Sequence, residues 1–211
     1  MKFRNATVLF TVLGLAAACN RKAATQPNYD NAINIYYQAH PACLWNSEKR
    51  FPVQSAPDDA KTEGYDALVD AGLLTRTTSE KKIVIISKRE NNYDLSEQGR
   101  AAWSADPNQP GYGNFCYGHR KVASIDSAAP TSGQPGATTT VNYHYTVTGV
   151  PAWASAAETQ TAFPQIQNAL NTPQPATATL TDTDSGWQVS SPGPTNASND
   201  PATPADSKIV Q

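Results

Sequence analysis

The stretch TTTVNYHYTVTGV, residues 138–150, decides the fold class of this chain. Apolar and aromatic side chains alternate in it with polar ones, which places on one face Val141, Tyr143, Tyr145 and Val147. The period of two residues predicts a β-strand. One apolar and one polar face is typical of an antiparallel sheet with one side in water.

The neighbouring segments predict the rest of this sheet. Residues 120–127 form a second expected strand, and Pro151 and Pro164 divide the following segment into two short helices. The stretch ATATLTDTDSGWQVS, residues 176–190, predicts a hairpin with its turn at 182–186. We therefore expect a small antiparallel sheet with a covering helix over residues 117–190, with Trp153 and Trp187 in its core.

The first half of the chain predicts mixed α and β elements. Apolar spacing indicates a helix over residues 29–40, and a second helix begins after Ser55-Ala56-Pro57-Asp58 and ends at Gly72. A β-branched run follows at residues 83–87. After a turn, Ser96 is the expected cap of a helix that carries Trp103.

The segments ALVDAGLL and YDLSEQGR resemble winged-helix domains, in which a helix ends in a Gly-Leu turn before the wing hairpin. The matching positions are Leu68, Gly72, Leu73, Tyr93, Leu95, Ser96, Gly99 and Arg100. The resemblance implies an α+β fold with a winged-helix-like region over residues 29–116, ahead of the antiparallel region. It also implies a protein-docking role, because some domains of this fold serve that purpose.

DNA binding is excluded for the winged-helix-like region on physical grounds. Its second helix carries Lys61 against five acidic residues, which are Asp58, Asp59, Glu63, Asp66 and Asp70. A surface of this charge repels a phosphate backbone. The formal net charge of the whole chain is −2 at pH 7, which gives no basic footprint for nucleic acid.

The N-terminus has the pattern of an export signal. Lys2 and Arg4 precede an uncharged apolar run over residues 6–18, and Ala16, Ala17 and Ala18 end it. A helix needs about 20 apolar residues to cross a bilayer, so the run is too short to span one. A basic start, a short apolar run and small residues predict a secretory signal peptide over residues 1–18.

This signal resembles that of bacterial lipoproteins, where a Leu and small residues precede a Cys that receives an acyl anchor. The resemblance implies lipidation of Cys19, although Leu15 lies four residues before it and the family has three. The alternative is cleavage after Ala18 that leaves Cys19 as a free thiol. Asn20 implies the periplasmic face of the outer membrane in a double-membraned host.

Export determines how the other cysteines are interpreted. Cys43 and Cys116 form an even pair in an oxidising compartment, so we predict a disulfide between them. The loop that it closes corresponds to about 4 kcal/mol of stability. The alternative, a metal site with His40 or His119, lacks the usual ligand spacing. We therefore expect neither a metal nor a cofactor.

The two ends of the exported chain are polar. Residues 19–28 are expected to tether the folded body to the membrane. Residues 191–211 contain several prolines and no apolar periodicity, which predicts a disordered tail.

No motif identifies a reaction. The sequence has no nucleophile elbow and no Gly-rich phosphate loop, and His144 lies on the polar face of its strand. A small anion contact is possible at Tyr117, His119, Arg120 and Lys121. Two functions remain: a non-enzymatic docking module for an envelope protein or cell-wall partner, or a small hydrolase acting on a cell-wall or small-molecule substrate.

Overall fold

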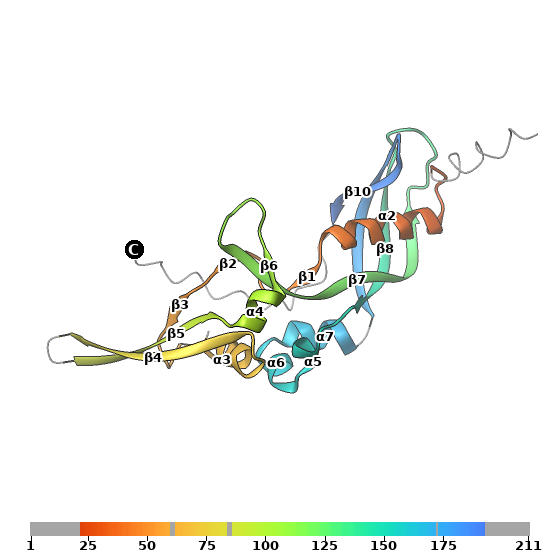
Figure 1. The fold of residues 1–211 in the computed structure, drawn as a ribbon. Helices are drawn as coiled ribbons and strands as arrows, with labels where there is room; N and C mark the ends of the chain where they lie inside the picture. Colours follow the sequence, from red (N-terminus) through yellow and green to blue (C-terminus); the bar gives the residue numbers. More distant parts are fainter. Residues whose placement is uncertain (1–21, 60–61, 84–85, 172, 193–211) are drawn as a thin grey trace, which may run out of the picture.

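The computed structural model describes residues 22–59, 62–83, 86–171 and 173–192. Antiparallel strands dominate it, and they form one seven-stranded and one three-stranded sheet (Figure 1). The larger sheet contains β1 (Ala42–Cys43), β2 (Lys49–Arg50), β6 (Trp103–Ala105), β7 (Tyr112–Ala129), β8 (Thr138–Thr148), β9 (Gln174–Thr183) and β10 (Gly186–Pro192). The smaller contains β3 (Val53–Ser55), β5 (Ile86–Leu95) and β4 (Leu74–Ile83), in that order.

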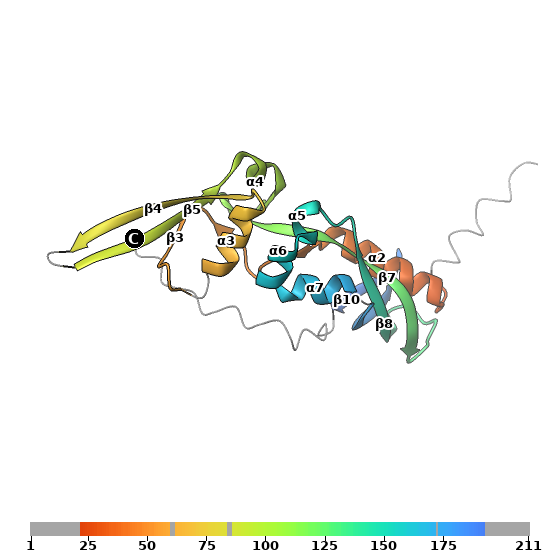
Figure 2. The same ribbon diagram turned by 90° about the horizontal axis from the view of Figure 1, so that it is seen from below.

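Helices are short and cover parts of these sheets. They are α2 (Gln26–Ala39), α3 (Thr62–Asp70), α4 (Glu97–Ala102), α5 (Ala152–Ser155), α6 (Ala157–Ala162) and α7 (Pro164–Asn171). The helix α2 lies along β7–β10 at one end of the elongated molecule, and the β4–β5 hairpin projects from the other end (Figures 1 and 2). Between them, α3 lies beside α6 in both views.

The strand β7 connects the two ends of the molecule. Its first half pairs with β1, β2 and β6, and its second half pairs with β8. At Gly113 a Cβ would lie 2.4 Å from the Ser104 carbonyl oxygen and 2.5 Å from Nε1 of Trp103, so the close strand packing requires glycine there. Register shifts between Val122 and Ser124 and between Ile125 and Ser127 bend the second half of the strand.

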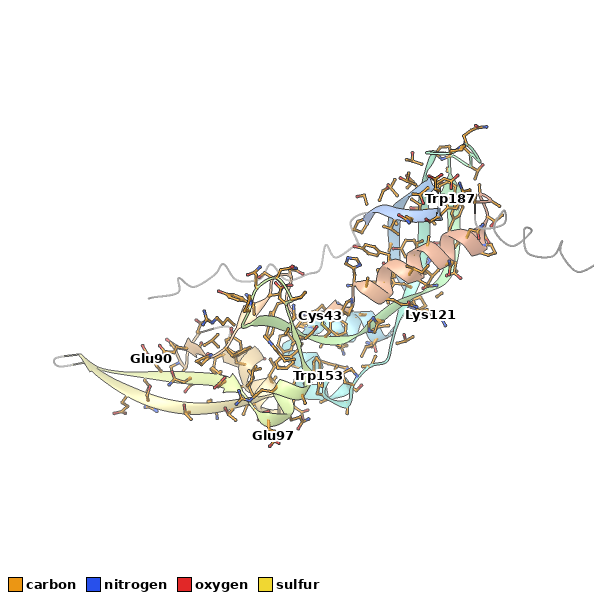
Figure 3. All side chains as sticks on the ribbon, turned by 45° about the horizontal axis from the view of Figure 1, so that its top comes forward. Cys43, Glu90, Glu97, Lys121, Trp153 and Trp187 are labelled. Carbon is orange, nitrogen blue, oxygen red and sulfur yellow. A yellow bond between two sulfur atoms is a disulfide. The ribbon has the colours of Figure 1, made fainter. Side chains whose placement is uncertain are left out.

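Two apolar cores form along this strand. The first lies under α2, where Tyr29, Ile33 and Tyr37 meet the inward residues of β8, β9 and β10. The alternation in β8 agrees with its sequence pattern, since Val141 and Tyr143 are buried. The second core lies around Phe115 and includes residues of α3, α5 and α7. Figure 3 places Trp153 of the second core and Trp187 of the first in different halves of the molecule.

The winged-helix expectation for residues 29–116 is wrong. The helix α2 packs on the large sheet rather than on α3, and α3 packs against α6, which comes from the second half of the chain. No helical bundle therefore forms in the first half among the described residues, and the fold is led by antiparallel sheet. The apolar faces of α2 and α3 pack on elements that are distant in the sequence. Short local motifs do not specify such distant contacts.

Local signals in the same region are correct. Gly72 has a positive φ of 75° just after α3, as its role in ending that helix requires. The Ser96 hydroxyl accepts a hydrogen bond from the Gly99 backbone N–H and caps α4. Trp103, which was expected inside this helix, begins β6 instead.

The described part of the expected tether is folded. The Ala23 carbonyl accepts hydrogen bonds from Trp187 Nε1 at 3.2 Å and from Asn28 Nδ2 at 2.8 Å. The helix α2 then begins at Gln26. The predicted signal peptide, the lipidation site Cys19 and residues 193–211 of the predicted tail lie outside the described residues.

The structure contains the predicted disulfide between Cys43 and Cys116. It joins β1 to β7 at directly paired positions, across a sequence separation of 73 residues. A structural disulfide is typical of an oxidising, exported compartment, and the protein is assigned to one. Within the described ranges, no helix has the length and apolar character needed to cross a membrane.

We predict that replacing Cys43 and Cys116 together by serine lowers the free energy of unfolding by about 4 kcal/mol, because the unfolded chain regains the entropy of an open loop. Urea denaturation of the oxidised protein and the variant measures the difference. Adding a reductant should lower the stability of the wild type and leave the variant unchanged. Equal stabilities would contradict the role of this bond.

Candidate functional site

An acidic groove lies between α3 and α6. Its volume is about 690 Å³, within the range of sites that bind ligands. The lining includes six carboxylate side chains, which are Asp58, Asp59, Glu63, Asp66, Asp70 and Glu158. No basic residue belongs to the described lining.

Helical spacing gathers most of these carboxylates. Glu63, Asp66 and Asp70 are separated by three and four residues along α3, so they lie on one face of the helix. Glu158 comes from the first turn of α6 and faces them across the groove. The sequence indicated the acidic helix, but Glu158 was missed because only the packing of α6 on α3 brings it there.

Asp66 is held in place by two hydrogen bonds. Its Oδ1 accepts hydrogen bonds from Arg76 Nη1 at 2.7 Å and from the Tyr93 hydroxyl at 2.8 Å. Burial raises the pKa of Tyr93, and the hydrogen bond to Asp66 raises it further. These hydrogen bonds connect α3 to the base of the β4–β5 hairpin, because Arg76 lies on β4 and Tyr93 on β5.

Four of the other groove carboxylates carry negative charge that no described ion pair offsets. Within the described ranges, Asp58, Glu63, Asp70 and Glu158 form no ion pair. Like charges at helical spacing repel one another, so the groove favours a cation that lies between them.

A smaller cavity of about 280 Å³ adjoins the groove and shares Ala67, Asp70 and Glu158 with it. Thr159 lines this cavity and is fully buried, at 0% exposure. Its Oγ1 has no hydrogen-bond partner among the described residues. A buried hydroxyl without a partner costs free energy, so the Thr159 side chain is a polar group in an otherwise apolar contact between the helices.

The four residues of the predicted anion contact separate along β7. Tyr117 is buried in the second core, whereas His119 and Lys121 are exposed on the strand. The Arg120 guanidinium lies 5.7 Å and 5.6 Å from the ring centroids of Tyr37 and Tyr145. These cation–π contacts give Arg120 a structural role beside the first core. An anion contact at these residues stays a prediction.

His144 has a partner on the solvated face of the large sheet. Its Nδ1 lies 2.8 Å from Oδ2 of Asp126, and both side chains are about two-fifths exposed, at 40% and 41%. The nearby Ser124 hydroxyl donates to Asp126 rather than to the imidazole. This arrangement lacks the base–nucleophile hydrogen bond that a hydrolytic triad uses.

His40 and the β9–β10 turn have structural contacts. His40 ends α2, where its ring stacks on Tyr36 at 4.0 Å between centroids. Asp182 is buried near the β9–β10 turn, which Asp184 and Ser185 form. The part of the chain that the structure describes contains no group of three or more residues suited to hold a metal ion.

Comparison with protein-family models, with curated proteins and with solved structures finds no match for this chain.

The buried tyrosines predict a loss of stability in alkaline solution. The hydroxyls of Tyr37 and Tyr143 lie 2.7 Å apart, and burial raises the pKa of both phenols. The unfolded chain releases these protons near pH 10, whereas the folded chain retains them. The contribution of these two phenols to the free energy of unfolding should therefore be constant below about pH 9. It should fall above about pH 10, by up to about 1.4 kcal/mol per pH unit for each phenol.

Denaturation titrations between about pH 8 and pH 12 measure this slope. The double variant Tyr37→Phe/Tyr143→Phe should show a shallower alkaline decline, and Tyr112→Phe, outside this pair, serves as the control. A decline of the same steepness in all three proteins would contradict the assignment.

Proposed function

We propose that this protein is a cell-envelope lipoprotein that binds a basic segment of a partner protein in the acidic groove. Its anchor is an acyl group on Cys19, and in a double-membraned host it faces the periplasm from the outer membrane. The observation that carries the docking role is the set of groove carboxylates, Glu63 and Asp70 on α3 and Glu158 on α6, that form no ion pair with another described residue. Such a surface attracts cations and repels phosphate.

The contacts of the N-terminal segment support the anchored arrangement. Residues 22–25 are already held against β10 and α2, so only Asn20 and Arg21 separate Cys19 from the folded body. This two-residue linker spans at most about 10 Å when fully extended. The α2 end of the molecule would therefore lie at the membrane, with the groove between α3 and α6 farther out (Figure 1).

The chemistry of the groove favours binding over catalysis. Its described lining contains carboxylates, threonines, alanines and a proline, and no histidine, serine or cysteine. Carboxylates at the surface of a groove select a partner by charge and by rate of encounter. A basic peptide segment, whose lysines or arginines reach between α3 and α6, fits this chemistry.

The anchor predicts a change in membrane attachment. Wild-type protein in its bacterial host should be found in the membrane fraction, whereas Cys19→Ala should be released after export or retained as a precursor. Fractionation with immunoblotting measures the distribution, and globomycin should block processing of the wild type. Processing that is insensitive to globomycin would contradict lipidation.

The groove predicts a loss of peptide binding on neutralisation. The variant Glu63→Gln/Asp70→Asn/Glu158→Gln should bind a peptide of alternating lysine and glycine about tenfold more weakly, because three charge contacts of about 0.5 kcal/mol each are lost. Calorimetric titration at low ionic strength measures the affinity, which should also fall with added salt.

The matched control removes three carboxylates elsewhere, in Glu48→Gln/Glu97→Gln/Asp126→Asn. It should keep the affinity of the wild type within about twofold, because interactions between exposed charges outside a Debye length are screened. An equal loss in both variants, or no binding of the peptide by the wild type, would contradict a specific role of the groove.

A further inference from the structure

We infer that a second copy of this chain pairs with the free edge of β4, so that the small sheets of two molecules join into one continuous sheet. This pairing is independent of the acidic groove, because it uses the backbone of β4 rather than the carboxylates of α3 and α6. The β4 edge is defined here as residues 75–80, all of which are exposed. Residues 81–83 continue the strand, but their side chains lie outside the described residues.

The strand β4 lies at the edge of the small sheet. The order of that sheet is β3, β5, β4, so one side of β4 has no strand partner among the described residues. Its pairing with β5 runs from Leu74 to Ile83 without a bulge. In Figures 1 and 2, β4 forms one margin of the hairpin that projects from the fold. An edge of this kind offers a row of backbone donors and acceptors to another strand.

The register of β4 on β5 determines which backbone groups face outward. The Ser96 N–H donates to the Leu73 carbonyl, one rung before the ladder that begins with Leu74 opposite Leu95. In an antiparallel ladder, positions that exchange hydrogen bonds alternate with positions that do not. The even-numbered residues of β4 therefore direct their N–H and C=O groups away from β5. On the β4 edge, these residues are Arg76, Thr78 and Glu80.

Two copies of the β4 edge fit each other in an antiparallel register. No described residue forms a hydrogen bond with the outward backbone groups of the edge. A two-fold axis at Thr78 places these groups against the same groups of the second copy, and it places Arg76 opposite Glu80 of that copy. Opposite charges at directly opposite positions stabilise an antiparallel pair. Because the contact is two-fold, the pair of Arg76 and Glu80 forms twice.

The neighbouring registers pair the charges of the edge less well. An axis at residue 77 places Arg76 opposite Thr78, and an axis at residue 79 places Glu80 opposite Thr78. An axis at Arg76 or at Glu80 places two like charges directly opposite each other, which destabilises the pair. The charges of the exposed run therefore select the register with its axis at Thr78.

Both charged side chains can reach a second copy. Glu80 is exposed and forms no ion pair with another described residue, although Arg89 lies opposite it on β5. The Arg76 side chain is 44% exposed, and its Nη1 donates to Asp66 Oδ1 at 2.7 Å. A guanidinium has five N–H donors, so Arg76 can bind Asp66 and the Glu80 carboxylate of the second copy together.

Disulfide cross-linking tests the register in the exported full chain carrying Cys19→Ser, which has no site for an acyl group. In the variant Thr78→Cys, the two substituted positions lie opposite each other at the axis, with Cα atoms about 5.5 Å apart, within the range of a disulfide. In the control Thr75→Cys, the two positions lie about 20 Å apart along the strands. Mild oxidation should convert the first variant to a covalent dimer on a non-reducing gel and leave the control monomeric.

Sedimentation equilibrium tests the charges. The Kd of the wild-type dimer should rise with added salt. Glu80→Lys should raise the Kd at least about tenfold, because two attractions become two repulsions. The control Glu90→Lys makes the same change of charge on β5, away from the β4 edge, and should keep the Kd within about twofold. Thermal unfolding checks that each variant is folded.

A wild type that stays monomeric at every concentration would overturn the second copy as the occupant of this edge. Equal cross-linking of both cysteine variants, or a dimer that Glu80→Lys does not weaken, would overturn the register. The groove variant Glu63→Gln/Asp70→Asn/Glu158→Gln should form the dimer as the wild type does. Its failure to do so would place the contact in the acidic groove and overturn the pairing of β4, whereas loss of peptide binding with the dimer intact separates the two sites.

Discussion

Strand β7 is the element on which the rest of the structure depends. It extends over Tyr112–Ala129, and its backbone supplies hydrogen bonds to β1, β2, β6 and β8. Phe115 from its first half lies in one core, and Val122 and Ile125 from its second half pack on the other. Because both cores use the same strand, each constrains the position of the other.

The groove follows from this arrangement. The chain leaves β8, forms α5, α6 and α7, and returns as β9, so the inserted helices are held at the end of the sheet formed with β7. There α6 meets α3, and Glu158 is brought to the acidic face that α3 already carries. Apolar burial between α3 and α6 stabilises this pair of helices. The stabilisation offsets the repulsion between neighbouring carboxylates, which would destabilise an isolated helix.

Periodicity was a reliable guide where a segment buries one face against a regular partner. It identified the strand at residues 138–150 and the hairpin near Trp187, and local chemistry identified the stop at Gly72 and the cap at Ser96. It failed where partners are distant in sequence. The choice of the large sheet as the partner of α2 depends on shape and burial over the whole chain, which the winged-helix resemblance did not contain.

Only the α3 side of the candidate site could be predicted from the sequence. The acidic residues on one face of α3 can be identified from their spacing in the sequence. The position of Glu158 and the burial of Thr159 depend on tertiary packing. Arg120 illustrates the same limit, because a basic residue between His119 and Lys121 looks available to an anion until Tyr37 and Tyr145 are placed around it.

The disulfide between β1 and β7 makes the stability of the protein depend on the compartment in which the chain resides. In the reducing cytosol Cys43 and Cys116 remain thiols, and the newly made chain lacks about 4 kcal/mol out of a typical total of about 5–15 kcal/mol. A chain weakened to this extent unfolds more readily than the oxidised protein. Oxidation in the exported compartment therefore supplies the part of the stability that the reduced chain lacks.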